Sequence, residues 1–158
     1  MIREAELQDL DDIINLLHQV LDVHYDALPH LFKENSVKYS KDELEKIIKE
    51  EIIKIFVFCI DNKVVGHLFC LIQDEKETNN QKARRFLFID DLCVDYQYRH
   101  QGIGDKLFNY AKDYAIKNKC DSILLNVYSK NINALCFYEK MGMNELKRTY
   151  EFKINKED

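Results

Sequence analysis

The feature that most constrains the fold is a strand, a glycine-containing turn and a helix that follow one another between Phe86 and Tyr114. The segment opens with an apolar run, FLFIDDLCV, which contains two adjacent aspartates and predicts a strand buried on at least one face. After the turn, apolar residues recur at spacings of three and four, which predicts an amphipathic helix. A helix that starts after small residues directs backbone N–H groups and the positive end of its dipole outward. The segment is therefore expected to receive a phosphate or pyrophosphate.

The sequence RHQGIG between the strand and the helix can be compared with three kinds of phosphate-binding turn. A P-loop requires Lys and then Ser or Thr after its last glycine, and Asp105 follows instead, which excludes it. A dinucleotide-binding fingerprint requires a small residue where Leu107 stands, and a lone Gly-x-Gly supports it weakly. The third pattern, Arg/Gln-x-x-Gly-x-Gly/Ala, is satisfied completely by Arg99, Gly102 and Gly104. An ordinary helix start after a flexible glycine turn is the alternative.

The third pattern resembles the pyrophosphate loop of the GNAT superfamily of N-acetyltransferases, which bind acetyl-coenzyme A. A second stretch, from Asn131 to Met143, resembles the other GNAT signature, Asn-x-x-Ala-x-x-Phe-Tyr-x-x-x-Gly-Phe. It departs from that signature only at its end, where Met143 is a comparable apolar filler for the usual aromatic residue. The resemblance is firm from about Lys54 to Lys153 and looser before. It implies an acyltransferase that uses acetyl-coenzyme A as acetyl donor and needs no metal.

The remaining segments predict a single α/β domain over residues 1–158. Further strands are expected at 2–5, 55–60, 64–72, 122–127, 144–146 and 149–154, and further helices at 10–21, 41–52 and 131–141. Ser40 and Glu43 form a capping box before the second of these helices, and residues 23–32 are expected to be irregular. The order β-α-α-β-β-β-α-β-α-β-β matches the GNAT fold, a mixed and mostly antiparallel sheet flanked by helices on both faces.

Charge and cysteine content limit the classes of partner. The net charge of −5, without a basic stripe, argues against nucleic acid and favours an amine-bearing substrate. No apolar run is long enough to span a membrane, and the first residues do not resemble a signal peptide. Five cysteines, an odd number without a Cys-x-x-Cys pair, indicate a reducing cytoplasm and no zinc site. The expected partner is a small-molecule amine, with a homodimer left open.

Acetyl transfer to an amine needs a base for the amine. A lysine-like amine has a pKa near 10.4, so a carboxylate must help to remove its proton at neutral pH. The resemblance to polyamine acetyltransferases places that carboxylate at Asp90, with Asp91 beside it. Adjacent side chains on a regular strand face opposite sides, so only one of the two is expected to face the acceptor. A bulge, which family members often carry here, could change which one, and both carboxylates could instead bind water or an arginine.

The departing thiolate also needs an acid, for which the resemblance implies Tyr138. A phenol carries its proton at pH 7, and the matching tyrosine of the family donates it to the thiolate. The alternative is a packed aromatic side chain beside Phe137. Cys93 was weighed as an acyl-accepting nucleophile, but it lies in an apolar strand with no histidine near it in sequence, which favours an inert core thiol.

The resemblance further implies coenzyme contacts from the strand end, the turn and the second motif. These residues are Leu92, Cys93, Val94, Arg99, His100, Gln101, Gly102, Ile103, Gly104, Asn131, Ala134 and Phe137. The backbone at 93 and 94 is expected to pair with the pantetheine amides, as a strand edge can. Asn131 is expected to hydrogen-bond the coenzyme, unless it serves only as a helix N-cap.

The acceptor is the part of the function that the sequence leaves open. Acceptors in the family include polyamines, antibiotics, amino acids, protein N-termini and lysines. Small-molecule amines rank first and protein acceptors second, and a non-catalytic acyl-coenzyme A binding module is a third alternative. The acceptor is expected to lie near 24–32, Asn126, Tyr128 and Tyr150.

Overall fold

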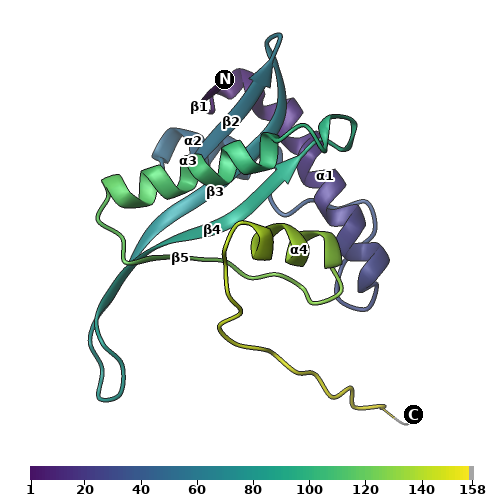
Figure 1. The fold of residues 1–158 in the computed structure, drawn as a ribbon. Coiled ribbons are helices and arrows are strands. Elements are labelled where there is room, and N and C mark those ends of the chain that lie inside the picture. Colours follow the sequence, from purple (N-terminus) through teal and green to yellow (C-terminus); the bar gives the residue numbers. More distant parts are fainter. Residues whose placement is uncertain (157–158) are drawn as a thin grey trace.

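The computed structural model describes residues 1–156 and shows an open, twisted sheet with helices on both faces (Figure 1). The strands are β1 (Ile2–Glu4), β2 (Lys54–Ile60), β3 (Lys63–Glu75), β4 (Arg84–Val94) and β5 (Ser122–Leu124). They lie side by side in sequence order, antiparallel except for the parallel pair β4–β5. The expected mixed, mostly antiparallel sheet is confirmed.

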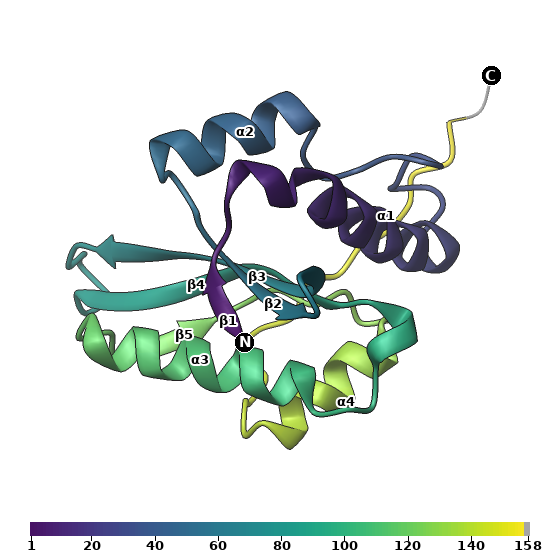
Figure 2. The same cartoon turned by 90° about the horizontal axis from the view of Figure 1, so that it is seen from above.

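The helices divide between the two faces of this sheet (Figure 2). They are α1 (Leu10–Ala27) and α2 (Lys41–Glu50) on one face, and α3 (Ile103–Lys117) and α4 (Ile132–Lys140) on the other, with short 3-10 helices at Leu7–Asp9 and Tyr96–Tyr98. Each face has its own apolar core: an α1-side core that includes Leu16, Leu44 and Phe69, and an α3-side core that includes Leu68 and Leu107. None of the helices within residues 1–156 is long and apolar enough to cross a membrane.

Two helix ends differ from the sequence-based expectation. The first helix was expected to end before Val23, but α1 continues to Ala27. Its last turn is held by packing, because the ring of His24 lies against the ring of Phe32 at a centroid distance of 5.1 Å. The second helix was expected to carry Ile52, but α2 ends at Glu50, since the next residue takes a left-handed φ of 52°. Ile52 is consequently exposed.

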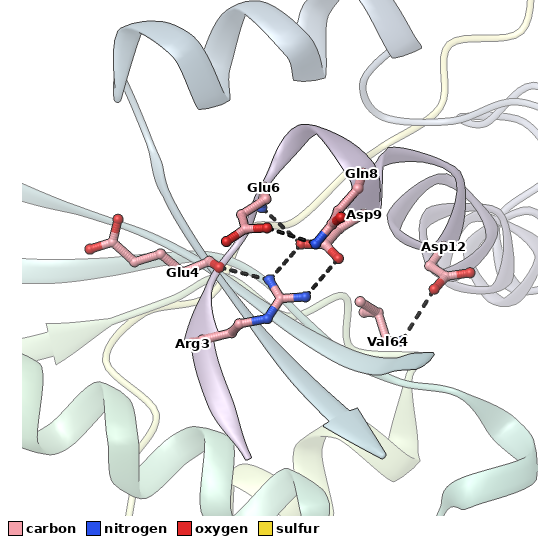
Figure 3. Close-up of polar contacts among 7 residues, drawn as sticks. All are labelled: Arg3, Glu4, Glu6, Gln8, Asp9, Asp12 and Val64. Atoms are coloured by element: carbon pink, nitrogen blue, oxygen red, sulfur yellow. Dashed lines mark hydrogen bonds and ion pairs between the residues drawn. The ribbon is translucent and has the colours of Figure 1, made fainter. Parts of the chain in front are cut away.

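A partly buried ion pair joins β1 to the start of α1 (Figure 3). The guanidinium of Arg3 donates to both carboxylate oxygens of Asp9 at 2.7 and 2.9 Å. The backbone N–H of Glu6 donates to the same carboxylate at 2.8 Å. Burial acts to raise the pKa of Asp9, but the hydrogen bonds from Arg3 and Glu6 outweigh it and hold that pKa below its usual value. The pair therefore fixes the position of α1 over the sheet.

The chain after α4 is the largest departure from the expected fold. Strands were expected at 144–146 and 149–154, but residues 144–156 form no strand and are all exposed. β5 was expected to reach Val127 and ends at Leu124. Its pairing with β4 runs only from Ser122, opposite Phe86, to Leu124, opposite Phe88. A strand requires a hydrogen-bonded neighbour. Within residues 1–156, neither residues 125–127 nor residues 144–154 have a strand beside them.

Candidate active site

A β-bulge in β4 shapes the centre of the candidate site. Across the β3–β4 ladder, Phe69 lies opposite Asp91 and Cys70 lies opposite Ile89. Asp90 therefore has no residue opposite it and is the extra residue of the bulge. A bulge breaks the strict alternation of a strand, so it changes which face of the sheet each later side chain meets.

The change of face is visible in the packing on either side of Asp90. Before the bulge, odd-numbered Leu87 packs in the α3-side core, and after it, even-numbered Leu92 packs against that core. Odd-numbered Cys93 belongs to the α1-side core. Because the bulge interrupts the alternation of the strand, both carboxylates have partners on the α1 side: Asp90 binds Lys38 and Tyr39, and Asp91 binds His67.

The carboxylate of Asp90 is engaged by two side chains from the segment that joins α1 to α2. The Lys38 ammonium lies 2.9 Å from Oδ1, and the hydroxyl of Tyr39 donates to Oδ2 at 2.7 Å. The Asp90 side chain is 15% exposed. Burial, followed by the hydrogen bond to Asp90, raises the pKa of Tyr39, so this phenol stays a donor at neutral pH. Both oxygens of the Asp90 carboxylate are therefore already occupied by donors.

Asp91 has a different partner, the imidazole of His67 in β3. The Nε2 atom of His67 makes a short hydrogen bond to Oδ2 of Asp91. The His67 side chain has no exposed surface, and that of Asp91 is 12% exposed. Because a carboxylate only accepts, the shared proton lies on Nε2, and the buried Nδ1 atom of His67 has no partner among residues 1–156. His67 thus fixes the orientation of Asp91 through Oδ2, and Oδ1 has no side-chain partner among residues 1–156.

Tyr138 lies on α4, whose first turn is capped by Asn131. The Tyr138 ring contacts the ring of Phe137 at a centroid distance of 5.2 Å and that of Phe108 at 6.3 Å. Burial raises the pKa of Tyr138, and the negative charge of Asp91 raises it further. The phenol therefore keeps its proton at neutral pH, as a general acid requires. Its ring also packs beside Phe137, which was the alternative to a catalytic role.

Cys93 is placed as a core residue. Its thiol is buried and donates to the backbone carbonyl of Leu16 at 3.6 Å. Burial raises the pKa of the Cys93 thiol, which disfavours the nucleophilic thiolate. The side chain therefore has no role in acyl transfer, and only its backbone remains a candidate for contact with a coenzyme.

The N-terminus of α3 is an open anion receptor. The N-cap of α3 is Gly102, and no side chain caps this terminus in the described chain. The other two helices that start from a loop are closed by side chains: Ser40 Oγ accepts from the third residue of α2, and Asn131 Oδ1 accepts from Ala134 in α4. The first amides of α3 are thus available to a phosphate. The hydrogen bond from Ala134 also shows that Asn131 serves as the N-cap of α4.

The two glycines of the turn are required for different reasons. Gly102 has a φ of 76°, which L side chains rarely adopt, and a Cβ there would meet no atom within 4 Å. A Cβ on Gly104 would lie 3.2 Å from Cε2 of Phe137, so this glycine lets α4 approach the first turn of α3. Arg99 is exposed, and its Nε donates to the carbonyl of Val94 at 3.2 Å, which ties the turn to the end of β4.

The end of β4 beside this helix terminus has an unpaired edge. β4 pairs with β5 only through Phe88, and no strand follows along that edge among the described residues. The last residues of β4, 92–94, thus offer backbone groups to an extended ligand, next to the N-terminus of α3. Tyr138 and the bulge lie within the same region of the fold. The structure therefore brings together the strand end, the turn and the Tyr138 motif.

An aromatic cluster closes the side of the site that faces α1. The rings of His24, Phe32 and Tyr128 lie against one another at centroid distances of 5.1 to 5.2 Å. Burial lowers the pKa of His24, with Lys38 adding to the effect and the charge of Asp91 opposing it. Tyr150, in contrast, is 84% exposed and lies outside the cluster.

Sequence reasoning missed Lys38, Tyr39 and His67. His67 had a local signal, since it is the one strongly polar side chain in the apolar run VVGHLFCLI. Lys38 and Tyr39 had none, because their contact with Asp90 depends on how the α1–α2 connection crosses the sheet. Within residues 1–156, no group of three His, Cys, Asp or Glu side chains is arranged to hold a metal ion.

Comparison with known proteins places these features in a family. Residues 17–143 match the model of the "Acetyltransferase (GNAT) family". A crystal structure of a mutant of the BH1408 protein from Bacillus halodurans matches with a TM-score of 0.93 at 28% identity, over 98% of this chain and 99% of that one. The L-amino acid N-acetyltransferase AaaT of Escherichia coli is 29% identical over 90% of this chain and 81% of its own length.

N-alpha-acetyltransferase 30 of Saccharomyces cerevisiae is 37% identical over 63% of this chain and 57% of its own length. The chain spans about half the length of several such curated relatives, for example 46% of the Dictyostelium discoideum protein of the same name.

Proposed function

Because this chain belongs to the acetyltransferase (GNAT) family, we propose that it transfers the acetyl group of acetyl-coenzyme A directly to a primary amine, with a small molecule as the preferred acceptor. The observation that carries the proposal is the uncapped N-terminus of α3, which lies between the unpaired end of β4 and the Tyr138 helix. Five free cysteines support a reducing compartment such as the cytoplasm.

The acetyl donor would be bound mainly by backbone groups. Its pyrophosphate fits the amides of Ile103, Gly104 and Asp105 at the positive end of α3, with Arg99 and the 100–102 backbone around it. Its pantetheine arm fits the unpaired edge at 92–94, where strand-like hydrogen bonds are free. Ala134 and Phe137 on α4 would form the apolar wall on the other side.

Proton transfer would be divided between Asp91 and Tyr138. Asp91, directly or through a water molecule, takes the proton that the ammonium group must lose before its nitrogen can attack. As the new C–N bond forms and the C–S bond breaks, the sulfur leaves as a thiolate and takes the proton of Tyr138. After attack the nitrogen still carries one excess proton, which it loses to give the neutral amide. That proton restores the Tyr138 phenolate, directly or through water, and Asp91 releases its own proton to solvent. We assign the base to Asp91 rather than Asp90, because Asp90 is already paired with Lys38 and Tyr39.

A small amine suits the side of the site that faces α1. Asp91 supplies negative charge there, and the aromatic cluster of His24, Phe32 and Tyr128 supplies faces that attract a cation. Relatives that act on small amines support this choice, including the amino-acid enzyme AaaT and a thialysine N-epsilon-acetyltransferase of Mus musculus. A protein N-terminus is the second candidate, favoured by the similarity to N-alpha-acetyltransferase 30.

The test has a binding step and a turnover step. Acetyl-coenzyme A should raise the melting temperature in a concentration-dependent way, since it binds the native state only. Thiol release should then be followed with L-amino acids, thialysine, polyamines, aminoglycosides and short peptides with free N-termini. Turnover of a small amine above all peptides supports the proposal, whereas preference for peptides favours the second candidate. A flat thermal titration up to millimolar ligand would remove the basis of the proposal.

A further inference from the structure

A primary amine of the chain itself lies at the bulge in the candidate site. The Nζ atom of Lys38 is 2.9 Å from Oδ1 of Asp90 and donates to the backbone carbonyl of the same residue at 3.0 Å. Among residues 1–156, Nζ has no other ion pair or hydrogen bond, and the Lys38 side chain is 46% exposed. The ammonium is therefore held at the bulge without being sealed from the rest of the site.

The electrostatics of neighbouring groups place Lys38 close to the residues proposed for proton transfer. Burial lowers the pKa of His24, and the charges of Asp91 and Lys38 then act on it in opposite directions, so both lie near this imidazole. The charge of Asp91 also adds to burial in raising the pKa of Tyr138. Lys38, Asp91 and Tyr138 thus share one neighbourhood, in which the amine of an acceptor must also be held.

The residue after Lys38 anchors the backbone that carries this amine. The ring of Tyr39 stacks on that of Phe69, in the α1-side core, at a centroid distance of 6.0 Å and an interplanar angle of 12°. Its hydroxyl donates to Oδ2 of Asp90 at 2.7 Å. A nucleophile that is held in place reacts far faster than one that must first be bound from solution. The anchored amine is therefore favoured as an acceptor over the other lysines of the chain.

We propose that the protein acetylates its own Lys38 on Nζ, with acetyl-coenzyme A as the donor. The proposal rests on the proposed acetyl transfer and adds a residue of the site itself to the acceptors. Acetylation would remove the positive charge of Lys38 and leave the carboxylate of Asp90 without its cation. The modification would thereby make the side of the site that faces α1 more negative.

The step balances with acetyl-coenzyme A as the only co-reactant. Asp90 Oδ1, which already contacts Nζ, takes one proton from the ammonium, and the nitrogen attacks the thioester carbonyl. The C–N bond forms, the C–S bond breaks, and the thiolate takes the proton of Tyr138. The nitrogen then loses a second proton to give the neutral amide. That proton restores the phenolate of Tyr138, directly or through water, and Asp90 releases its own proton to solvent.

The test follows acetylation of individual lysines when the full-length protein is incubated with acetyl-coenzyme A. Peptide mass mapping over time gives a rate for each site. Lys41 is the matched control lysine, because its ammonium also lies 2.9 Å from a carboxylate and its side chain is 57% exposed, but its partner is the exposed Asp11 of α1. Lys38 should be acetylated at least about tenfold faster than Lys41, and Lys38→Arg should lose this modification. Equal rates at Lys38 and Lys41 would overturn the proposal.

Two further samples separate enzymatic from chemical acetylation. In Tyr138→Phe, the rate at Lys38 should fall to about that at Lys41, because the acid is missing. In wild-type protein that is unfolded in urea, the two lysines should react at similar rates. A fast rate at Lys38 that Tyr138→Phe leaves unchanged would overturn the proposal, because the amine would then react with the thioester without help from the site.

The dependence on protein concentration separates reaction within one chain from reaction between copies. The first-order rate constant at Lys38 should be the same from about 1 to about 50 μM protein, because donor and acceptor are held by one chain. A rate constant that rises in proportion to protein concentration would overturn the proposal in favour of acetylation of one copy by another.

Thermal stabilisation by acetyl-coenzyme A and turnover of a free amine, measured on the same protein, test the proposed function separately. If both are observed while Lys38 stays unmodified, only the self-acetylation is refuted. If acetyl-coenzyme A does not stabilise the protein, both proposals fail.

Discussion

The choice between Asp91 and Asp90 as base can be decided by replacing each with asparagine, which keeps the shape and removes the charge. Loss of a positioned base lowers turnover by about 10²–10⁴-fold. Asp91→Asn should therefore reduce kcat by at least about a hundredfold at pH 7, or about 3 kcal/mol. Asp90→Asn removes a partly exposed ion pair with Lys38, worth about 1 kcal/mol or less, and should leave kcat within about threefold of wild type.

The assay is thiol release from saturating acetyl-coenzyme A with an identified acceptor, from pH 6.5 to 9.5. The neutral fraction of the amine rises about tenfold per pH unit below its pKa near 10.4. The deficit of Asp91→Asn should therefore shrink by up to that factor per unit. If Asp90→Asn loses activity in this way and Asp91→Asn does not, the base assignment is reversed. If both variants keep wild-type rates while chemistry limits turnover, neither carboxylate is the base.

Three other substitutions test separate parts of the structure. Tyr138→Phe should lower kcat by about a hundredfold without recovery at high pH, because alkali supplies no proton to the thiolate, while acetyl-coenzyme A affinity measured by calorimetry stays unchanged. Gly104→Val should weaken coenzyme binding and also lower the melting temperature, since its Cβ would crowd Phe137; normal binding would refute the anion-receptor assignment. Asp9→Asn should cost about 2–3 kcal/mol in urea unfolding at pH 7 by leaving Arg3 unpaired. That difference should be constant above about pH 5 and should shrink as the pH falls below about 4, the ordinary carboxyl pKa. Folding lowers the pKa of the wild-type carboxylate, so its contribution disappears only as the pH falls through that lower folded-state pKa. A difference that does not change between about pH 5 and pH 2 would contradict the ion-pair account.

Local patterns predicted the elements whose stability is local. The spacing of Ile103, Leu107 and Ala111 defined α3, and Ser40 capped α2 as expected, with its Oγ 3.1 Å from the backbone N of Glu43. Each depends on residues within one or two turns of a helix. For the same reason the glycine turn and the strand before it were found in the right order.

The rest depended on contacts between distant segments. Nothing in the sequence distinguishes Asp90 as an unpaired residue, because a bulge is a property of two strands in register. The alternation in residues 149–154 was recognised, but a strand also needs a neighbour, and residues 1–156 supply none for this segment. The pairing of Asp90 with Lys38 depends on a connection 52 residues away. Sequence reasoning therefore found the two motifs but could not identify the partners of the two aspartates.

Because of the bulge, the face on which a β4 side chain lies depends on how many residues separate it from Asp90. Residues before Asp90 and residues after it are sorted onto the two faces of the sheet by opposite parity. Deleting Asp90 would remove the bulge and leave Asp91 opposite Phe69, so Asp91 and Cys93 would stay on the α1 side. Deleting a paired residue such as Leu92 would instead turn Cys93 toward α3. Deleting one residue of the 76–83 connection would only shorten an exposed turn. Among the paired residues of β4, therefore, a missing residue should be harder to tolerate than a changed one.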